Sequence, residues 1–397
     1  MSELDGLGHE LSQEEAMATQ GNGPLIKVIG VGGGGTNAID RMIQVGISGV
    51  QFIAANTDAQ ALALSEAPHR IQLGPQTTKG LGAGGDPDVG ARAATESADE
   101  LRELLSGSEI LFLALGLGGG TGTGAGPVIA DLARQSGALT IAVATIPFSF
   151  EGRRRTEVAQ EGLHMLRDKS DTLIAISNDR LLEFIDEETS LDIAFRIADE
   201  VLRQGIQGVA ELVTYTGLIN LNLMHVRRVL QNAGSALMSV GQGRGDGRAA
   251  AAAELAISSP LTELSSIAGA SGILVNVTGG TDLSLDEIQK AVSTIAGVAS
   301  PDADIFFGAT VDPNMEGQVQ VMLVAVGMGN AAQVPALDAR ILDRRLRSVT
   351  PSGAFSAAQV SLEDGYRAEN SLDPSDLDIP TFLRRRREAR VTEEKHD

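Results

Sequence analysis

The residues best suited to chemistry form a glycine-rich run from Gly116 to Pro127, GLGGGTGTGAGP, in which seven of twelve residues are glycine. Glycine accepts positive φ and lets the backbone approach a ligand, so successive N–H groups can point at an anion. An apolar strand is expected before the run, at 110–115, and a helix after it, at 128–133. Proline suits a first helical turn, so Pro127 is expected in the first turn of this helix. The pattern predicts a strand–loop–helix cradle for phosphate, because a flexible linker would be polar on both sides.

The run is not a Walker A motif, because no lysine follows its glycines. This disfavours an ordinary P-loop ATPase or GTPase. Two further glycine loops, at 30–37 and 78–87, also precede predicted helices. Three such loops suit a nucleotide phosphate chain that is held from several sides.

The first loop leaves an alternative open. Gly30, Gly32 and Gly35 match the dinucleotide fingerprint G-x-G-x-x-G after a predicted strand. Asp58, at the end of the next strand, could bind a ribose, as a nicotinamide-dependent oxidoreductase requires. Asn56 and Asp58 could equally be caps of a short helix.

Polar residues follow other predicted strands. Arginines in the loop 151–155 could reach phosphates or form a solvated basic patch. Asn178 could contact a base edge or belong to a turn. Phe195 and Asp199 lie one helical turn apart, so both could face one pocket, with core and surface positions as the alternative.

Composition limits the classes of function. The 397 residues include no cysteine, 43% hydrophobic residues and a formal net charge of −21. Disulfides, thiolate metal sites and cysteine catalysis are excluded, and the five histidines form no metal-ligand cluster. The acidic balance argues against a nucleic-acid partner. Without a membrane-length apolar span or a signal-peptide pattern, a cytoplasmic protein is expected.

The elements that must position these residues form two folded parts. Strand–helix alternation predicts a Rossmann-like parallel sheet, with ligands at the carboxyl ends of its strands. The expected divisions are a disordered segment 1–23, a nucleotide domain 24–189, a central helix 190–216, an α+β domain 217–328, a flexible linker 329–371 and a docking peptide with tail 372–397.

Several motifs together resemble the FtsZ family of bacterial, tubulin-like cell-division GTPases. They are GGGTGTG at 118–124, the loop 78–84, NTD at 56–58 with QAL at 60–62, FEG at 150–152, NDR at 178–180 and DLDIPTFL at 376–383. The resemblance implies an α/β tubulin/FtsZ-like fold with a GTP-binding domain, a central helix and a C-terminal domain.

The resemblance also implies sites and partners. GTP or GDP, with Mg²⁺ on its phosphates, would contact Gly32, Gly33, Gly34, Asn37, Asn56, Gly84, Gly118, Gly119, Gly120, Thr121, Gly122, Thr123, Gly124, Glu151, Arg155, Asn178, Phe195 and Asp199. Glu151 would hold the ribose, Asn178 and Asp199 the guanine, and Phe195 would lie against its ring. Subunits would stack head to tail into the mid-cell division ring. Segment 376–387 would bind membrane-tethering adaptor proteins through Asp378, Ile379, Pro380, Phe382 and Leu383.

One motif departs from the family pattern. The family's catalytic loop, N-x-D-x-x-D, enters the next subunit's pocket, and its carboxylates position the attacking water. Here the loop is Asn220-Leu221-Asn222-Leu223-Met224-His225, without either carboxylate. Loss of a general base typically costs ~10²–10⁴ in rate, although a neutral imidazole at His225 could replace it in part. We expect a GTP-binding filament with slow or absent hydrolysis, either a division protein or a structural or regulatory paralogue that co-assembles with an active homologue.

Overall fold

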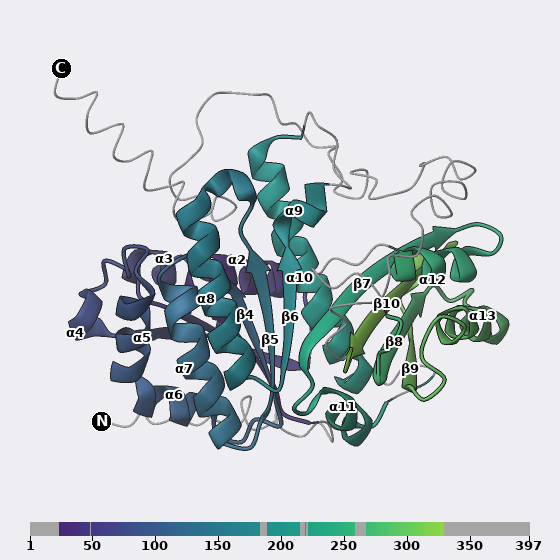
Figure 1. The fold of residues 1–397 in the computed structure, drawn as a ribbon, viewed down its shortest axis with the longest axis horizontal. Coiled ribbons are helices and arrows are strands. Elements are labelled where there is room, and N and C mark those ends of the chain that lie inside the picture. The colour runs from purple at the N-terminus through teal and green to yellow at the C-terminus, as the bar shows by residue number, and fades with distance from the viewer. Residues whose placement is uncertain are drawn as a thin grey trace, which may run out of the picture.

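Ten strands of the described residues form one sheet. Figure 1 shows the computed structural model, in which helices pack along this sheet. The structure describes residues 24–47, 49–182, 189–214, 219, 221–258 and 267–328. The segments expected at 1–23 and 372–397 lie outside these residues, as do the whole linker 329–371 and Asn220 of the catalytic loop.

The strand order is β3-β2-β1-β4-β5-β6-β7-β10-β8-β9. The strands are β1 (Ile26–Val31), β2 (Val50–Asn56), β3 (His69–Gln72), β4 (Ile110–Gly116), β5 (Leu139–Ile146), β6 (Thr172–Ser177), β7 (Gly234–Arg244), β8 (Gly272–Gly279), β9 (Asp304–Val311) and β10 (Gln318–Val326). Neighbours from β3 to β7 are parallel, β10 is antiparallel to β7 and β8, and β8 is parallel to β9. The predicted α/β class is therefore confirmed.

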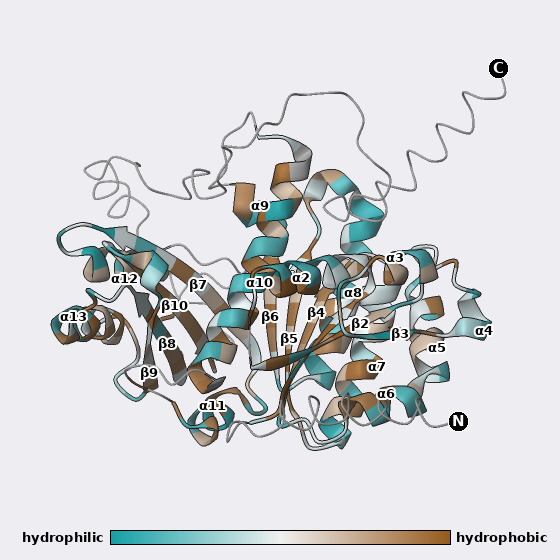
Figure 2. Ribbon diagram, turned by 180° about the vertical axis from the view of Figure 1, so that it is seen from behind, coloured by the Kyte–Doolittle hydropathy of each residue, from teal (hydrophilic) through white to brown (hydrophobic). Residues whose placement is uncertain are grey.

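Helices cover both faces of the sheet, and the brown, apolar strands lie between them (Figure 2). The helices are α2 (Gly32–Gln44), α3 (Ala59–Ala63), α4 (Pro75–Thr78), α5 (Pro87–Glu96), α6 (Ala98–Leu105), α7 (Thr121–Gln135), α8 (Arg153–Lys169), α9 (Asn178–Leu181), α10 (Leu191–Thr214), α11 (Leu223–Leu230), α12 (Arg248–Ser258) and α13 (Leu285–Ala296), with 3₁₀ turns at Ser149–Glu151 and Pro313–Met315. Strand β4 is buried along almost its whole length, as a central parallel strand requires.

The start of α7 differs from the prediction. This helix begins at Thr121, so Pro127 lies inside it rather than in its first turn. Close packing explains the early start, because a Cβ on Gly122 would lie 2.4 Å from the Gly116 carbonyl oxygen. The helix can approach β4 this closely only because glycine is at that position.

Helix α10 joins the two halves of the sheet. Its 24 residues span about 36 Å at 1.5 Å per residue. Val201, Leu202 and Val209 are fully or almost fully buried. At Gly208 an added Cβ would lie 2.1 Å from the sulfur of Met322 on β10, so glycine is what lets the helix lie against this strand.

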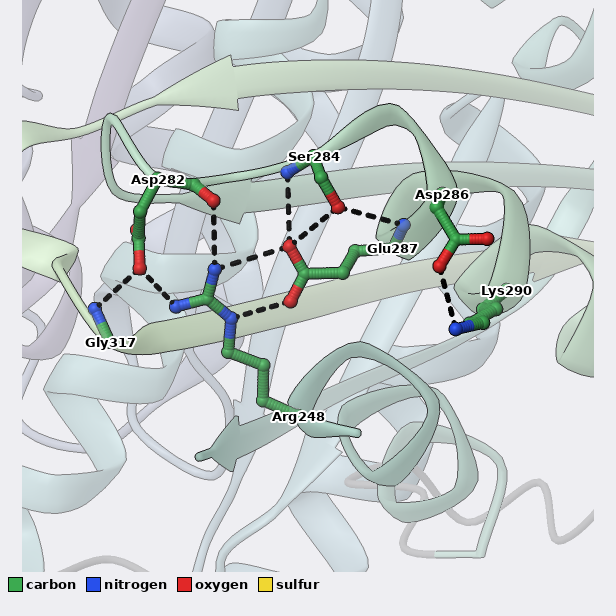
Figure 3. A network of polar contacts seen from close by, with 7 residues as sticks. All are labelled: Arg248, Asp282, Ser284, Asp286, Glu287, Lys290 and Gly317. Atoms are coloured by element: carbon green, nitrogen blue, oxygen red, sulfur yellow. Dashed lines mark hydrogen bonds and ion pairs between the residues drawn. The ribbon is translucent and has the colours of Figure 1, made fainter. Parts of the chain in front are cut away.

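In the C-terminal half, Arg248 ties α12 to the turn before α13 (Figure 3). Its guanidinium donates to Glu287 Oε1 at 2.7 Å and to Asp282 Oδ2 at 2.6 Å. Glu287 also forms a capping box with Ser284 at the start of α13. Hydrogen bonds from Arg248 lower the pKa of Glu287 to about 2.

Among the described residues, no helix is both long enough and apolar enough to cross a membrane.

Candidate functional site

A cavity of about 490 Å³ lies at the carboxyl ends of β1, β4, β5 and β6. This is the edge of a parallel sheet where ligands bind in open α/β folds, and the volume is that of a small-molecule site. Glycine loops after β1, β3 and β4 form much of its wall.

The cavity brings together most of the residues expected to contact GTP. It is lined by Gly32, Gly33, Gly34, Asn37, Asn56, Gly84, Gly118, Gly119, Gly120, Thr121, Gly122, Glu151, Arg155, Asn178, Phe195 and Asp199. They come from segments spread over more than 160 positions, because the parallel strands end side by side.

Thr123 and Gly124, also expected there, do not line the cavity. Thr123 is fully buried, and its hydroxyl oxygen accepts a 2.9 Å hydrogen bond from the Gly118 N–H. A Cβ on Gly124 would lie 1.9 Å from the Pro87 carbonyl oxygen. In this structure Thr123 fixes the glycine loop, and Gly124 lets α7 approach α5.

Two helix N-termini lie at the wall of the cavity, where the sequence predicts a phosphate cradle. Helix α2 begins at Gly32 and α7 at Thr121, both at the cavity wall. The first N–H groups of each helix have no intrahelical partner, and the two helix dipoles add partial positive charge. A Cβ on Gly32 would lie 3.0 Å from the Gly122 nitrogen, so glycine lets the two N-termini converge on one anion.

Two buried amides on the cavity wall, those of Asn56 and Asn178, each have one polar atom without a partner among the described residues. The two atoms are Asn178 Oδ1 and Asn56 Nδ2, and both residues are at most 5% exposed. A buried polar atom without a partner is costly. One atom accepts and the other donates, so a ligand with both kinds of group would satisfy them.

Glu151 and Arg155 form a half-buried ion pair on the cavity wall. Arg155 Nη1 lies 3.1 Å from Glu151 Oε2, and Glu151 Oε1 accepts the Phe148 N–H at 2.9 Å. Burial raises the pKa of Glu151, while Arg155 and the Phe148 N–H oppose this shift. This ion pair holds the Arg155 guanidinium at the cavity. There a phosphate oxygen could accept hydrogen bonds from the guanidinium, as the Glu151 carboxylate does.

Phe195 and Asp199 lie one turn apart on α10, and both line the cavity. The Phe195 ring meets Phe148 edge-on at 5.4 Å. The Asp199 carboxylate forms an ion pair with Arg41 of α2, with Oδ2 and Nε 3.7 Å apart. An aromatic face beside a carboxylate is suited to a planar base that carries N–H donors.

Several residues that line the cavity were not among those expected to contact GTP. They are Val31, Thr57, Asp58, Gly82, Ala83, Gly85, Gly116, Leu117, Thr145, Pro147 and Ala198. Many of them are next in sequence to residues that were expected to contact GTP, and this position was the signal that could have identified them. Thr57 and Thr121 pair through their hydroxyls at 2.6 Å. Asp58 caps α3 by accepting from Gln60 and Ala61, as the capping alternative held.

Asn222 and His225, the two described candidate catalytic residues, lie at the other end of the sheet. Helix α11 leads into β7, whose first residues pair with the start of β6. Figure 1 shows α11 at the bottom of the molecule. Asn222 caps this helix, its Oδ1 accepting the Met224 N–H at 3.0 Å. The exposed His225 stacks on Phe306 with ring centroids 4.9 Å apart. His225 therefore cannot reach the cavity of its own chain.

Fold and cavity define a nucleotide-binding α/β protein. A model described as the Tubulin/FtsZ family, GTPase domain, matches residues 25–186, and one for the FtsZ family, C-terminal domain, matches 234–329. An FtsZ dimer from M. jannaschii, solved empty, is 41% identical, with a TM-score of 0.74 over 80% of this chain and 92% of that chain. The chain belongs to the FtsZ family, and its GTPase domain implies binding of GTP and GDP.

More distant structures share the fold. CetZ2 from Haloferax volcanii, solved as a GTPγS-bound protofilament, is 19% identical with a TM-score of 0.66 over 82% of this chain and 98% of that chain. CetZ1 from the same organism, a GDP-bound monomer, is 21% identical with a TM-score of 0.67 over 81% and 99%. None of these comparisons supports the nicotinamide-dependent alternative.

Proposed function

We propose that this protein is a GTP-binding, self-polymerising cytoskeletal protein of the cell-division ring, which hydrolyses GTP slowly. The observation that carries the proposal is an intact nucleotide cavity in a chain whose opposite end lacks both catalytic carboxylates. Binding and assembly would be retained, and turnover would be reduced.

The cavity suits GTP in both of its chemical parts. The N-termini of α2 and α7 would hold the phosphates, with Arg155 beside them. Asn178, Phe195 and Asp199 would contact guanine, which has N–H donors for a carboxylate. Among the described residues no group of three or more His, Asp or Glu could hold a metal, so Mg²⁺ would take most of its ligands from phosphate oxygens and water.

Self-association follows from the separation of the two ends. The cavity lies at the carboxyl ends of the parallel strands, whereas α11, which carries His225, leads into β7 at the start of β6, so any contact between the two needs a second copy. Repeated in one direction, that contact makes a filament. The titles of the related structures, an FtsZ dimer and a CetZ2 protofilament, support such an arrangement.

Slow hydrolysis follows from the chemistry of Asn222 and His225. An amide can orient water but cannot take its proton, and the Asn222 oxygen already caps α11. The imidazole of His225 can act as a base only while neutral. Filaments that keep GTP should be long-lived, because hydrolysis would no longer weaken the subunit contacts.

The membrane connection would run through the tail. Residues Asp378, Ile379, Pro380, Phe382 and Leu383, outside the described range, form a short apolar motif before four arginines. Such a peptide suits docking into an adaptor groove. It would attach cytoplasmic filaments to the membrane at mid-cell through division adaptor proteins.

The test is phosphate release with GTP and Mg²⁺, followed together with light scattering across pH 5.5–8. We expect scattering with little phosphate release, and release that rises with pH if His225 acts as base. The matched control is the double variant Asn222→Asp, His225→Asp, which restores both carboxylates and should raise turnover by ~10²-fold or more. A wild-type rate equal to that of the double variant would refute the view that the missing carboxylates limit hydrolysis.

The carboxylates are missing from the catalytic loop while the nucleotide cavity is kept. This combination also favours a second role, as a hydrolysis-deficient paralogue. In a mixed filament, this chain would cover the nucleotide of an active neighbour without supplying a catalytic carboxylate. Titration into an active homologue would then lower phosphate release in proportion to the added protein. An unchanged rate, despite co-sedimentation of the two proteins, would remove this role.

A further inference from the structure

A charged residue lies directly behind the cavity wall, at the place where the guanine base is expected to bind. Asp199 lines the cavity, whereas its ion-pair partner Arg41 does not. From this arrangement we infer that Arg41 is a positioning residue, which orients the Asp199 carboxylate and thereby sets the preference for guanine. The inference rests on the proposed binding of GTP and adds a residue to its recognition.

The geometry places Arg41 behind the carboxylate. Arg41 follows Asn37 by one turn of α2, and Asn37 lines the cavity. Helix α10 carries Asp199 past this part of α2, so that Arg41 Nε lies 3.7 Å from Asp199 Oδ2. The two side chains are only 19% and 15% exposed, so solvent screens their attraction less than it screens a surface pair.

The chemistry of the base explains why orientation matters. Guanine presents two adjacent donors, N1–H and the 2-amino group, which a carboxylate can accept together. Hypoxanthine lacks the 2-amino group and offers only N1–H. A carboxylate that rotates freely would form the paired contact less often, because it would first have to lose that rotational freedom. The Arg41 guanidinium beside one Asp199 oxygen restricts this rotation before the base binds, and so lowers the entropic cost of the paired contact.

Selectivity between GDP and IDP therefore reports on Arg41. We would measure both dissociation constants with the full-length chain, using diphosphates to avoid hydrolysis. The wild type should prefer GDP by at least tenfold, since one charge-assisted hydrogen bond is at stake. Arg41→Met should reduce this preference several-fold, mainly by weakening GDP. Arg41→Lys keeps the cation and should restore most of the preference.

A merely structural role for Arg41 predicts a different outcome. Both nucleotides would then weaken by the same factor in Arg41→Met, leaving the ratio unchanged, and this result would overturn the inference. Failure of Arg41→Lys to recover any preference would do the same. Thermal unfolding of each variant without nucleotide shows whether the fold is retained.

Asp199→Asn separates this inference from the proposed function. Its amide can donate to the 2-oxygen of xanthine, so this variant should lose GDP and gain XDP. A clear GDP-to-XDP switch, together with an unchanged GDP-to-IDP ratio in Arg41→Met, refutes only the role of Arg41. Unchanged GDP binding in Asp199→Asn refutes the base contact, and the role of Arg41 with it.

Discussion

The glycines of the main loop should separate into two kinds when each is replaced by alanine. Gly124 and Gly119 lie in the same motif, yet only Gly119 lines the cavity. A Cβ on Gly124 would lie 1.9 Å from the Pro87 carbonyl oxygen, whereas a Cβ on Gly119 would have no neighbour within 4 Å. Gly124→Ala should therefore affect folding, and Gly119→Ala should affect ligand binding.

The magnitudes follow from packing and helix propensity. Replacing glycine by alanine inside a helix gains about 1 kcal/mol. Overpacking typically costs ~1–3 kcal/mol, and more where the contact is with backbone that cannot rotate away. For Gly124→Ala the separation of α7 from α5 would have to increase, so we expect a net loss of about 1–2 kcal/mol. For Gly119→Ala the free energy of unfolding should stay within about 0.5 kcal/mol of the wild type.

Two measurements on each variant test this division. Urea unfolding without nucleotide gives the free energy of unfolding, and competition with a fluorescent GDP gives the dissociation constant. Gly119→Ala should raise the GDP dissociation constant by roughly tenfold, about 1.4 kcal/mol, because its methyl group occupies space beside the phosphates. If Gly124→Ala unfolds like the wild type but loses GDP binding, the packing role assigned to Gly124 is wrong.

Three further predictions concern other parts of the fold. Burial raises the pKa of Glu211 on α10 above the ordinary 4.5, so stability should fall as pH rises through the folded-state pKa. Glu211→Gln should make the free energy of unfolding less dependent on pH in this range. Hydrogen bonds from Arg248 and Ser284 lower the pKa of Glu287 from 4.5 to about 2, so stability should be lost as pH falls through that window. Arg248→Met should weaken this acid dependence in urea titrations, because it removes the largest cause of the shift. Asn222→Ala should cost about 0.5–2 kcal/mol in unfolding free energy by removing the cap of α11, whereas Asn222→Asp, which can still cap, should not.

Much of the fold could be predicted because the central strands are unambiguous. β4 and β5 are apolar runs, β4 leads into the main glycine loop, and their alternation with helices indicates a parallel sheet. Strand β7 was missed, because its glycines at 241 and 243 weaken the strand pattern. In the structure they let α12 lie against the sheet, since a Cβ at either position would be 2.0 Å from a carbonyl oxygen of α12. That reason becomes visible only when the partner helix is placed.

The candidate site could be predicted where each residue follows a strand. Asn178 comes directly after β6, and Arg155 shortly after β5, so topology alone brings them together. The pattern could not divide a glycine-rich motif into residues that bind and residues that pack, because both uses require the absence of a side chain. Thr123 was assigned to the ligand for the same reason, whereas its hydroxyl holds the loop.

The joint between β6 and β7 has a mechanical consequence. Along the described part of the sheet, these strands pair over only the three positions 172–174, whereas β7 and β10 pair over the nine positions 318–326. A sheet resists bending in proportion to the hydrogen bonds that cross the bend, so deformation should concentrate at this short ladder. Helix α10 runs alongside this ladder and would act as a rigid link between the two parts of the sheet, one on each side of the β6–β7 pairing. Load applied at the cavity end would then change the angle between these two parts before it changed the shape of either one.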